Sequence, residues 1–265
     1  MPPGTDMAKS RFALITGASG GIGECFARRL AARKQNLALV ARSREKLEAI
    51  ANELSATHGI RAEAIAADLS ETGAAEGLVR ELDARGIEVD LLVNNAGFGA
   101  NGEFWKLPLE RQEQMLRLNI EALVELTHLL APGMTERKNG GVINVASTAG
   151  FLPIAYTTTY AASKAFVISF SMGLAEELQP YGVRVVTLCP GATRTDFFKA
   201  GDYGEHRKVP GGFQAPEGVV EEALRALDRG GGLVVPRWLN KLNVFLLRLT
   251  PRSVVARMAA RVFRP

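Results

Sequence analysis

The sequence predicts a single α/β domain in which about seven parallel strands form a doubly wound sheet with helices on both faces. Two observations predict this class. Short apolar runs of strand length alternate with segments of helical periodicity along nearly all of the 265 residues. No internal repeat or low-complexity linker interrupts the alternation, so we expect one domain with a single sheet.

The elements can be placed in order from their patterns. The first strand, 11–16, precedes a helix over 22–33 in which Ile22, Phe26 and Leu30 share one face. Further strands are expected at 36–41, 60–66, 89–93, 141–146, 183–188 and 233–235, and further helices at 45–57, 71–85, 109–134, 158–179 and 216–227. Right-handed crossovers then bring the carboxyl ends of the strands to one edge, where doubly wound sheets bind their ligands.

The two ends of the chain fall outside this alternation. Residues 1–10 are expected to be a disordered tail, 11–236 the domain, and 237–265 an amphipathic helical extension packed on it. One face of the extension carries Trp238, Leu242, Phe245, Leu246 and Leu249, and Pro251 begins a second helix with Val254, Val255 and Met258. Covering a substrate mouth, pairing subunits and lying on an acidic membrane surface all suit this pattern, and packing on the protein is favoured.

Charge is distributed unevenly along the chain. The net charge is +4, but the segment from residue 229 onward holds eight basic and no acidic residues, and subtracting these eight leaves −4 for residues 1–228. The body of the protein therefore lacks the basic surface of a nucleic-acid-binding protein. No stretch of 18 or more apolar residues occurs, so we expect no transmembrane segment.

The cysteines and the first residues bear on location. Cys25 and Cys189 belong to no metal-ligand cluster, and two free thiols are typical of a reducing compartment. The first ten residues lack the apolar core of a signal peptide. We therefore expect a soluble, cytoplasmic protein without a metal site.

A glycine-rich segment, TGASGGIG, follows the first strand directly. Glycines allow a tight turn close to a pyrophosphate, and the N–H groups that begin the next helix favour anions. The residues expected to hold the phosphates are Gly17, Ser19, Gly20, Gly21, Ile22 and Gly23. A glycine-rich turn without a ligand is the alternative, but a preceding strand and a following helix favour a dinucleotide site.

The end of the second strand indicates which dinucleotide is bound. An acidic residue there would bind a ribose 2′-hydroxyl, whereas Arg42, followed by Ser43, suits a 2′-phosphate. NADP(H) is therefore expected. The alternative is that Arg42 and Arg44 are a solvated pair at a helix start.

Two further strand ends are expected to border the cofactor. Asp68 and Leu69 close the third strand beside the adenine, although Asp68 is also a candidate helix N-cap. Asn94, Ala96 and Gly97 close the fourth strand. Small side chains there leave room for the cofactor, and asparagine amides can tie adjacent strands together.

A tyrosine and a lysine lie one turn apart at the start of a helix. The i, i+4 spacing of Tyr160 and Lys164 puts both on one face, and an ammonium near a phenol is expected to lower its pKa from about 10. Such a phenol exchanges protons near neutral pH. Ser147, at the end of a strand, is placed to bind a substrate oxygen. An exposed helical pair is the alternative for Tyr160 and Lys164 taken alone.

Together these motifs resemble the short-chain dehydrogenase/reductase family. The matches are TGASGGIG, NNAG, Asn119 in LNI, Ser147, YAASK, and Pro190-Gly191 with Thr195 four residues on. The resemblance implies a Rossmann-type sheet of order 3-2-1-4-5-6-7 and a homodimer or homotetramer. It implies a catalytic tetrad of Asn119, Ser147, Tyr160 and Lys164, in which Lys164 also holds the nicotinamide ribose and Asn119 supports a water-linked proton path. The implied nicotinamide contacts are Pro190, Gly191, Thr193 and Thr195.

The expected activity is hydride transfer between NADP(H) and a carbonyl or alcohol carbon, with Tyr160 as the acid or base. Apolar residues near the expected site, above all Phe98, Phe151 and Phe197, indicate a hydrophobic small-molecule substrate. The segment 201–212 is expected to be a mobile lid. A catalytically silent nucleotide-binding regulator, an NAD-dependent alcohol dehydrogenase and an epimerase remain as alternatives.

Overall fold

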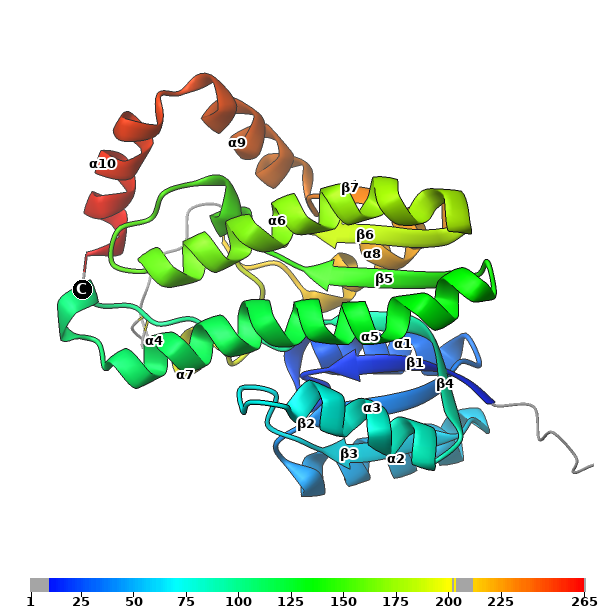
Figure 1. The fold of residues 1–265 in the computed structure, drawn as a ribbon. Coiled ribbons are helices and arrows are strands. Elements are labelled where there is room, and N and C mark those ends of the chain that lie inside the picture. The colour runs from blue at the N-terminus through cyan, green and yellow to red at the C-terminus, as the bar shows by residue number, and fades with distance from the viewer. Residues whose placement is uncertain (1–9, 202, 204–211, 265) are drawn as a thin grey trace, which may run out of the picture.

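Seven parallel strands form one sheet in the order β3-β2-β1-β4-β5-β6-β7 in the computed structural model, which describes residues 10–201, 203 and 212–264. The strands are β1 (Ser10–Thr16), β2 (Asn36–Ala41), β3 (Ala62–Ala66), β4 (Ile87–Asn94), β5 (Gly140–Val145), β6 (Val183–Leu188) and β7 (Gly232–Val234). The predicted fold class and strand order are confirmed. The strand arrows in Figure 1 point the same way, so the carboxyl ends of the strands lie along one edge of the sheet.

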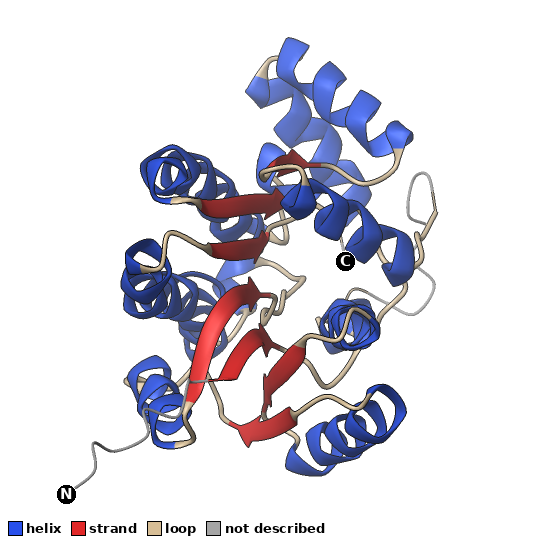
Figure 2. Cartoon of the chain, turned by 90° about the vertical axis from the view of Figure 1, so that its right-hand side faces the viewer, coloured by secondary structure: helices blue, strands red, loops and turns tan. Residues whose placement is uncertain are grey.

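Helices cover both faces of the sheet (Figure 2). Helices α1, α2 and α8 contribute to one core cluster with the sheet, and α3, α5 and α6 to the cluster on the opposite face. The α-helices are α1 (Gly21–Ala32), α2 (Arg44–His58), α3 (Ala74–Ala84), α4 (Leu109–Leu116), α5 (Ala122–Glu136), α6 (Thr158–Leu178), α7 (Phe197–Ala200), α8 (Pro216–Asp228), α9 (Trp238–Leu249) and α10 (Arg252–Phe263).

Strand β1 is buried on both faces of the sheet, which explains why its sequence is a continuous apolar run. Phe12 and Leu14 pack into the cluster on one face of the sheet, and Ala13 and Ile15 into the cluster on the other. All four side chains are fully buried, because both faces of a doubly wound sheet are covered. Burial of each large apolar side chain stabilises the fold by about 1.5–3 kcal/mol.

The helix expected over 109–134 is interrupted. A π-helical turn, Arg117–Glu121, separates α4 from α5, and α5 continues to Glu136 with Pro132 inside its last turns. A π turn adds one residue to a turn without changing the apolar character of the segment, so hydrophobic periodicity does not reveal it.

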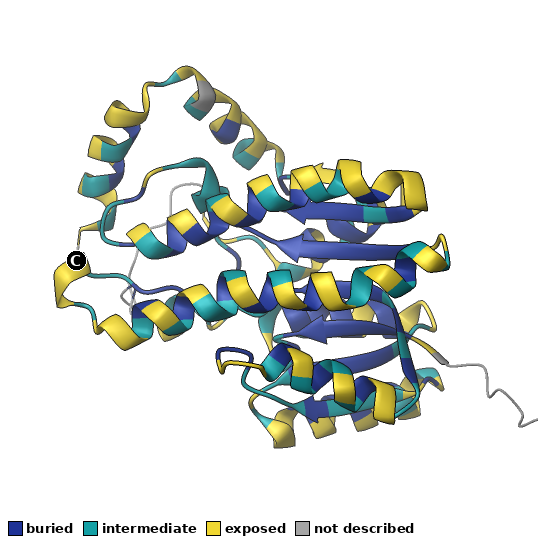
Figure 3. Cartoon of the chain, in the orientation of Figure 1, coloured by how far each residue is buried: buried dark blue, intermediate teal, exposed yellow. Residues whose placement is uncertain are grey.

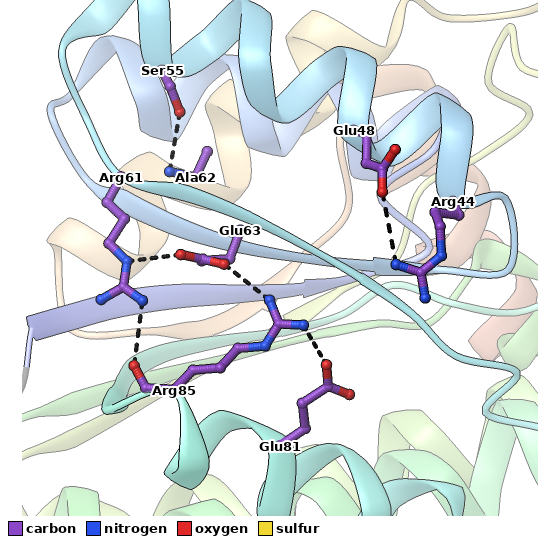
Figure 4. Close-up of polar contacts among 8 residues, drawn as sticks. All are labelled: Arg44, Glu48, Ser55, Arg61, Ala62, Glu63, Glu81 and Arg85. Carbon is purple, nitrogen blue, oxygen red and sulfur yellow. Dashed lines mark hydrogen bonds and ion pairs between the residues drawn. The ribbon is translucent and has the colours of Figure 1, made fainter.

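Edge strand β3 is anchored by polar contacts (Figure 4). The Glu63 carboxylate accepts hydrogen bonds from Arg61 Nε at 2.8 Å and from Arg85 Nη1 at 2.9 Å. The Ser55 hydroxyl on α2 accepts from the amide of Ala62 at 3.2 Å. These contacts lie at the amino-terminal start of β3 and tie the strand to α2 and to the end of α3.

The C-terminal extension forms two helices, but the predicted face of α9 is exposed and Val244 is buried instead. On α10, Val255 of the predicted face is buried together with Ala259, whereas Val254 and Met258 are exposed. Helix α9 is apolar on two sides, so periodicity could not tell which side faces the domain. Residues 1–9 of the predicted tail, and residue 202 and residues 204–211 of the predicted lid, lie outside the described residues; Ser10 begins β1. Among the described helices, none has the length and apolar character to cross a membrane.

Candidate active site

Two adjoining cavities lie at the carboxyl edge of the sheet, with volumes of about 490 Å³ and 640 Å³. Both are bordered by Gly17 and Ser19 of the glycine-rich loop and by Gly97 after β4. The first cavity also contains Ser147, Tyr160 and Lys164, and the second contains the residues that follow β2 and β3. The glycine loop therefore joins a catalytic compartment to a second, polar compartment.

The glycine loop is shaped by positions that tolerate no side chain. Gly17 and Gly21 have φ angles of +65° and +57°, and a Cβ on Gly21 would lie 2.9 Å from Thr195 Cγ2. A Cβ on Gly20 would meet nothing within 4 Å, because this residue borders the open cavity. Ile22 also lines the first cavity. Gly23 does not line either cavity: a Cβ there would lie 2.2 Å from the Gly17 carbonyl oxygen, so Gly23 lets the helix pack behind the loop.

The loop is tied to the end of β4 by reciprocal hydrogen bonds. Thr16 Oγ1 accepts from the amides of Asn95 at 3.0 Å and Ala96 at 2.9 Å. Asn95 Nδ2 donates to the Thr16 carbonyl at 2.9 Å. The predicted role of asparagine amides in joining strands is confirmed, and three hydrogen bonds fix the start of the loop beside the end of β4.

Asn94, predicted to contact the cofactor, lies elsewhere. Its Nδ2 donates to Asn144 Oδ1 at 2.9 Å and to Thr127 Oγ1 at 3.0 Å inside the core. It lines neither cavity, whereas Asn95 lines the first. The alternation of side chains along a strand sends neighbouring residues to opposite sides, and the motif alone did not show which of the two faces the site.

A cationic group forms the outer wall of the second cavity. Arg42, Ser43 and Lys46 all line it, and Lys46 also lines the first cavity. Sequence reasoning missed Lys46. The available signal was its position one helical turn after Arg42, which puts both cations beside the start of α2.

Asp68 and Leu69 line the same cavity, as expected from the end of β3. The Asp68 carboxylate accepts from the Ser70 amide at 3.0 Å and its hydroxyl at 2.6 Å, and Arg42 Nη1 lies 3.8 Å from Asp68 Oδ2. Burial raises the pKa of Asp68, but the Ser70 bonds and Arg42 outweigh it and hold the pKa below its usual value. The N-cap reading is wrong, because α3 begins only at Ala74.

Tyr160 and Lys164 lie in the first two turns of α6 and are both buried, 9% and 5% exposed. Lys164 Nζ donates to the Val145 carbonyl at 2.8 Å and lies 5.8 Å from the centroid of the Tyr160 ring. Ser147 follows β5 and also lines the first cavity, and its Oγ accepts from the Ala149 amide at 3.1 Å. The alternative of an exposed helical pair is therefore excluded.

The expected lowering of the Tyr160 pKa is wrong for the protein by itself. Burial in an apolar pocket raises the pKa of the phenol, and a hydrogen bond involving Ser147 lowers it only in part. Burial also disfavours the charged form of Lys164 and therefore lowers the pKa of its ammonium to about 8. The desolvation of both groups outweighs their proximity, because the ammonium is directed at the Val145 carbonyl rather than at the phenol oxygen.

Asn119 lies in the π turn and is 1% exposed. Its Oδ1 accepts from the Phe98 amide at 3.1 Å, and its Nδ2 donates to the Phe98 carbonyl at 3.0 Å and to Ser163 Oγ at 3.1 Å. A Cβ on Gly97 would lie 2.8 Å from Asn119 Oδ1 and 3.5 Å from Lys164 Nζ. Asn119 therefore clamps the loop after β4 beside the lysine.

The predicted nicotinamide contacts form one side of the first cavity. Pro190, Gly191, Thr193 and Thr195 all line it. The Thr148 amide donates to the Pro190 carbonyl at 2.9 Å, which fixes the end of β6 beside the end of β5. A Cβ on Gly191 would lie 2.7 Å from Asn240 Nδ2, so α9 packs directly on this segment.

Aromatic and apolar side chains form the remaining wall. Phe197 of α7 packs on Tyr160 with ring centroids 5.2 Å apart, and Phe98 lines both cavities. Val262 and Phe263 of α10 also line the first cavity. The wall is completed by Leu152, Ile154, Phe198 and Tyr203.

Phe151, predicted to bind substrate, does not line either cavity. It packs on a core cluster that contains Val167, Val235 and Val244. The short helical turn Thr148–Phe151 directs its last residue away from the cavity. Residues 152 and 154 take the predicted place instead.

The site's shape and donors fit a dinucleotide phosphate. The open space beside Gly20, the uncapped start of α1 and the Ser19 hydroxyl suit a pyrophosphate. Arg42, Ser43 and Lys46 provide donors for a further phosphate on the ribose. Asp68 is the one carboxylate among the residues that line the second cavity in the described part of the chain.

Comparison with known proteins agrees with this architecture. The profile of the family described as short chain dehydrogenase matches residues 11–205. Very-long-chain 3-oxoacyl-CoA reductases from Anas platyrhynchos and Mycosarcoma maydis are 36% and 35% identical over 71% and 86% of this chain. The chain spans only 61% and 65% of the length of these two relatives. The ketoacyl reductase HetN from Nostoc is 32% identical over 91% of this chain and 85% of its own length.

Solved structures show the same fold over nearly the whole chain. A short-chain dehydrogenase from Sphingobium yanoikuyae in complex with NADPH has a TM-score of 0.80 at 32% identity, covering 92% of this chain and 97% of that chain. A structure concerning 7β-hydroxysteroid dehydrogenase stereoselectivity has a TM-score of 0.84 at 26% identity, covering 96% and 98%. With the family profile matching well over half of its residues, this chain belongs to the short-chain dehydrogenase family.

Proposed function

We propose that this protein is an NADP(H)-dependent oxidoreductase that interconverts a ketone and a secondary alcohol on a hydrophobic substrate. The observation that carries the proposal is the placement of Ser147, Tyr160 and Lys164 in one cavity that continues to the glycine loop. The cationic group of Arg42 and Lys46 supports the choice of NADP(H) over NAD. The relative from Sphingobium yanoikuyae solved with NADPH supports it as well.

The protein's own residues supply position and proton transfer. When bound, NADP(H) supplies or accepts the hydride. Ser147 Oγ and Tyr160 Oη hold the substrate oxygen, and the Tyr160 phenol, kept protonated by burial, delivers its proton to that oxygen during reduction. The phenolate left behind is stabilised by the hydrogen bond with Ser147 and, at longer range, by the positive charge of Lys164, whose Nζ donates to the Val145 carbonyl and lies 5.8 Å from the centroid of the Tyr160 ring.

The substrate we favour is a 3-oxoacyl thioester with a long chain. The cavity wall beside Tyr160 is built from Phe197, Val262, Phe263 and other apolar side chains, which suit an alkyl chain. The names of the curated relatives, 3-oxoacyl-CoA reductases and a ketoacyl reductase, support this class. Loss of NADPH absorbance on addition of 3-oxoacyl thioesters of increasing chain length tests it.

Tyr160→Phe separates the proposal from a regulator that only binds nucleotide. This variant should lose turnover by at least about 100-fold, since it lacks the transferable proton, while NADPH still raises its melting temperature. Full turnover in the variant would overturn the assignment. Absence of turnover in the unaltered protein across a panel of ketones and alcohols would favour the regulator, and greater stabilisation by NADH than by NADPH would favour an NAD-dependent dehydrogenase.

A further inference from the structure

Helix α9 carries an apolar face that points away from the domain. Val244 is buried against the core, whereas five large residues on the opposite side are between 45% and 71% exposed. These residues are Trp238, Leu242, Phe245, Leu246 and Leu249. Their spacing puts them on a single face, and the burial of Val244 fixes that face outward.

Helix α10, which follows α9 directly, carries a second row of exposed apolar residues. Val255 and Ala259 are buried, while Val254, Met258 and Val262 are 41%, 61% and 50% exposed. Eight of the eighteen large hydrophobic side chains exposed in the described part of the chain therefore lie on α9 and α10. Figure 3 shows that much of the ribbon of both helices is exposed. Single exposed apolar residues are ordinary, but a concentration of this kind indicates a contact surface.

Positive charge accompanies this apolar surface. Arg252, Arg257, Arg261 and Arg264 are all exposed, and within the described residues none forms an ion pair with a carboxylate. From residue 229 to the end the sequence contains no acidic residue. Lys241 of α9 pairs with Glu222 at 3.6 Å, but these four arginines have no carboxylate partner among the described residues, so a partner that covers them must be apolar with an acidic rim.

We propose that α9 and α10 lie on the surface of an anionic lipid bilayer, with Trp238, Phe245, Leu249 and Met258 inserted at the level of the acyl chains. A helix with aromatic and leucine residues on one face and arginines beside them binds in this orientation, through apolar burial and attraction to acidic headgroups. A second copy of the chain is the less favourable occupant. An isologous contact would bring like-charged arginine sets together without acidic residues between them.

The exposed surface of α9 and α10 lies beside the cavity, so contact with a bilayer would affect how substrate reaches the site. Val262 and Phe263, at the end of α10, line the cavity that contains Tyr160. The start of α4, where Leu109 is 70% exposed, lies at the same end of the molecule as the end of α10 (Figure 1). Membrane docking would bring the cavity mouth to the lipid and let an apolar substrate pass between them. This last step rests on the proposed function, whereas the docking itself does not.

Flotation of the full chain with lipid vesicles tests the docking without reference to activity. Vesicles of phosphatidylcholine with phosphatidylserine should bind the protein, and vesicles of phosphatidylcholine alone should bind it much more weakly. The Phe245→Ser, Leu249→Ser double variant and the Arg252→Glu, Arg257→Glu double variant should each reduce binding by about tenfold or more. Turnover of a water-soluble ketone and the melting temperature should stay unchanged in both variants.

Matched substitutions far from the surface provide the control. Tyr181→Ser removes an exposed aromatic residue and Arg80→Glu reverses an exposed charge, and both should leave vesicle binding intact. Failure of the unaltered chain to bind anionic vesicles would overturn the proposal. Equal binding by the α9 and α10 variants would overturn it too. The proposal would also be overturned if the unaltered chain forms a stable dimer that vesicles do not disrupt and that the Phe245→Ser, Leu249→Ser variant converts to monomer.

Discussion

The Lys164 ammonium lies 5.8 Å from the centroid of the Tyr160 ring, in a site where both side chains are almost fully buried. Burial raises the pKa of the Tyr160 phenol and lowers the pKa of the Lys164 ammonium, so both groups are shifted toward their neutral forms. A neutral phenol is the form that donates a proton to a carbonyl oxygen. In the protein by itself the phenol therefore holds the proton that the proposed reduction would use.

We predict that burial of Lys164 makes stability depend on pH. Its pKa is about 8 in the folded chain and near 10.5 when unfolded. Below pH 8 both states hold the proton and the folded state bears the full desolvation penalty. As pH rises from about 8, the folded state releases its proton first, so the free energy of unfolding increases, by at most about 3 kcal/mol for this group.

Chemical denaturation of the unaltered protein and of Lys164→Met, between pH 7 and pH 10, measures this effect. The unaltered protein should gain stability relative to the variant across that range, because groups that titrate in both chains cancel in the difference. Parallel curves for the two proteins would show that the lysine is not desolvated as the structure indicates.

Two glycines with almost the same backbone conformation should respond differently to alanine. Gly17 and Gly59 have φ angles of +65° and +62°, but a Cβ on Gly17 would lie 2.8 Å from Asn95 Nδ2, and one on Gly59 meets nothing within 4 Å. We expect Gly59→Ala to cost about 1–2 kcal/mol from strain alone. Gly17→Ala should cost about 1–3 kcal/mol more and weaken NADPH binding.

Urea unfolding of both glycine variants, with and without NADPH, separates the two effects. Similar losses of stability in both, with NADPH protecting both equally, would mean that the loop does not touch the dinucleotide.

Coenzyme preference should depend on Arg42 and Lys46 but not on Arg44. The first two line the second cavity, whereas Arg44 lies 3.7 Å from Glu48 along α2 and lines neither cavity (Figure 4). Combined replacement of Arg42 and Lys46 by alanine should weaken NADPH binding about 10- to 100-fold and leave NADH binding nearly unchanged. Titration of the Kd for each nucleotide checks this, with Arg44→Ala as the control that should keep its preference.

The aromatic residues near the cavity should divide into substrate contacts and core residues. Phe263 lines the cavity, and Phe151 packs on the cluster around Val167. Phe263→Ala should raise the KM of a long-chain 3-oxoacyl thioester by about tenfold, with little change for a short one. Phe151→Ala should lower the melting temperature and leave both KM values close to normal; the reverse pattern would contradict the assignment of the wall.

Much of the fold could be predicted from the sequence, because each strand is buried on both faces and reads as an apolar run, and glycine loops and polar residues mark the turns. Helix α9 could not be oriented in this way. Both Val244 and Leu242 lie in apolar rows, and only the tertiary contact with the domain shows that Val244 is the buried one.

The candidate site was predictable where a motif depends on local backbone, as in the glycine loop and the Tyr160–Lys164 spacing. The site was not predictable where the direction of a side chain decides whether it faces the cavity or the core. Neighbouring residues Asn94 and Asn95 point to the core and to the cavity respectively, and Phe151 turns away from the wall. The direction of the Tyr160 pKa shift was predicted wrongly, because a sequence shows nearby charges but not the depth of burial.

The π turn at Arg117–Glu121 has a further consequence for anyone who redesigns this protein. It contains one residue beyond the regular helical repeat, and Asn119 reaches the backbone of Phe98 from this widened turn. Deleting a single residue there would let α4 and α5 merge into one regular helix and would rotate the amide by about a quarter of a revolution. Idealising the backbone would thus disconnect the clamp, and such irregular turns should be left intact when the scaffold is stabilised.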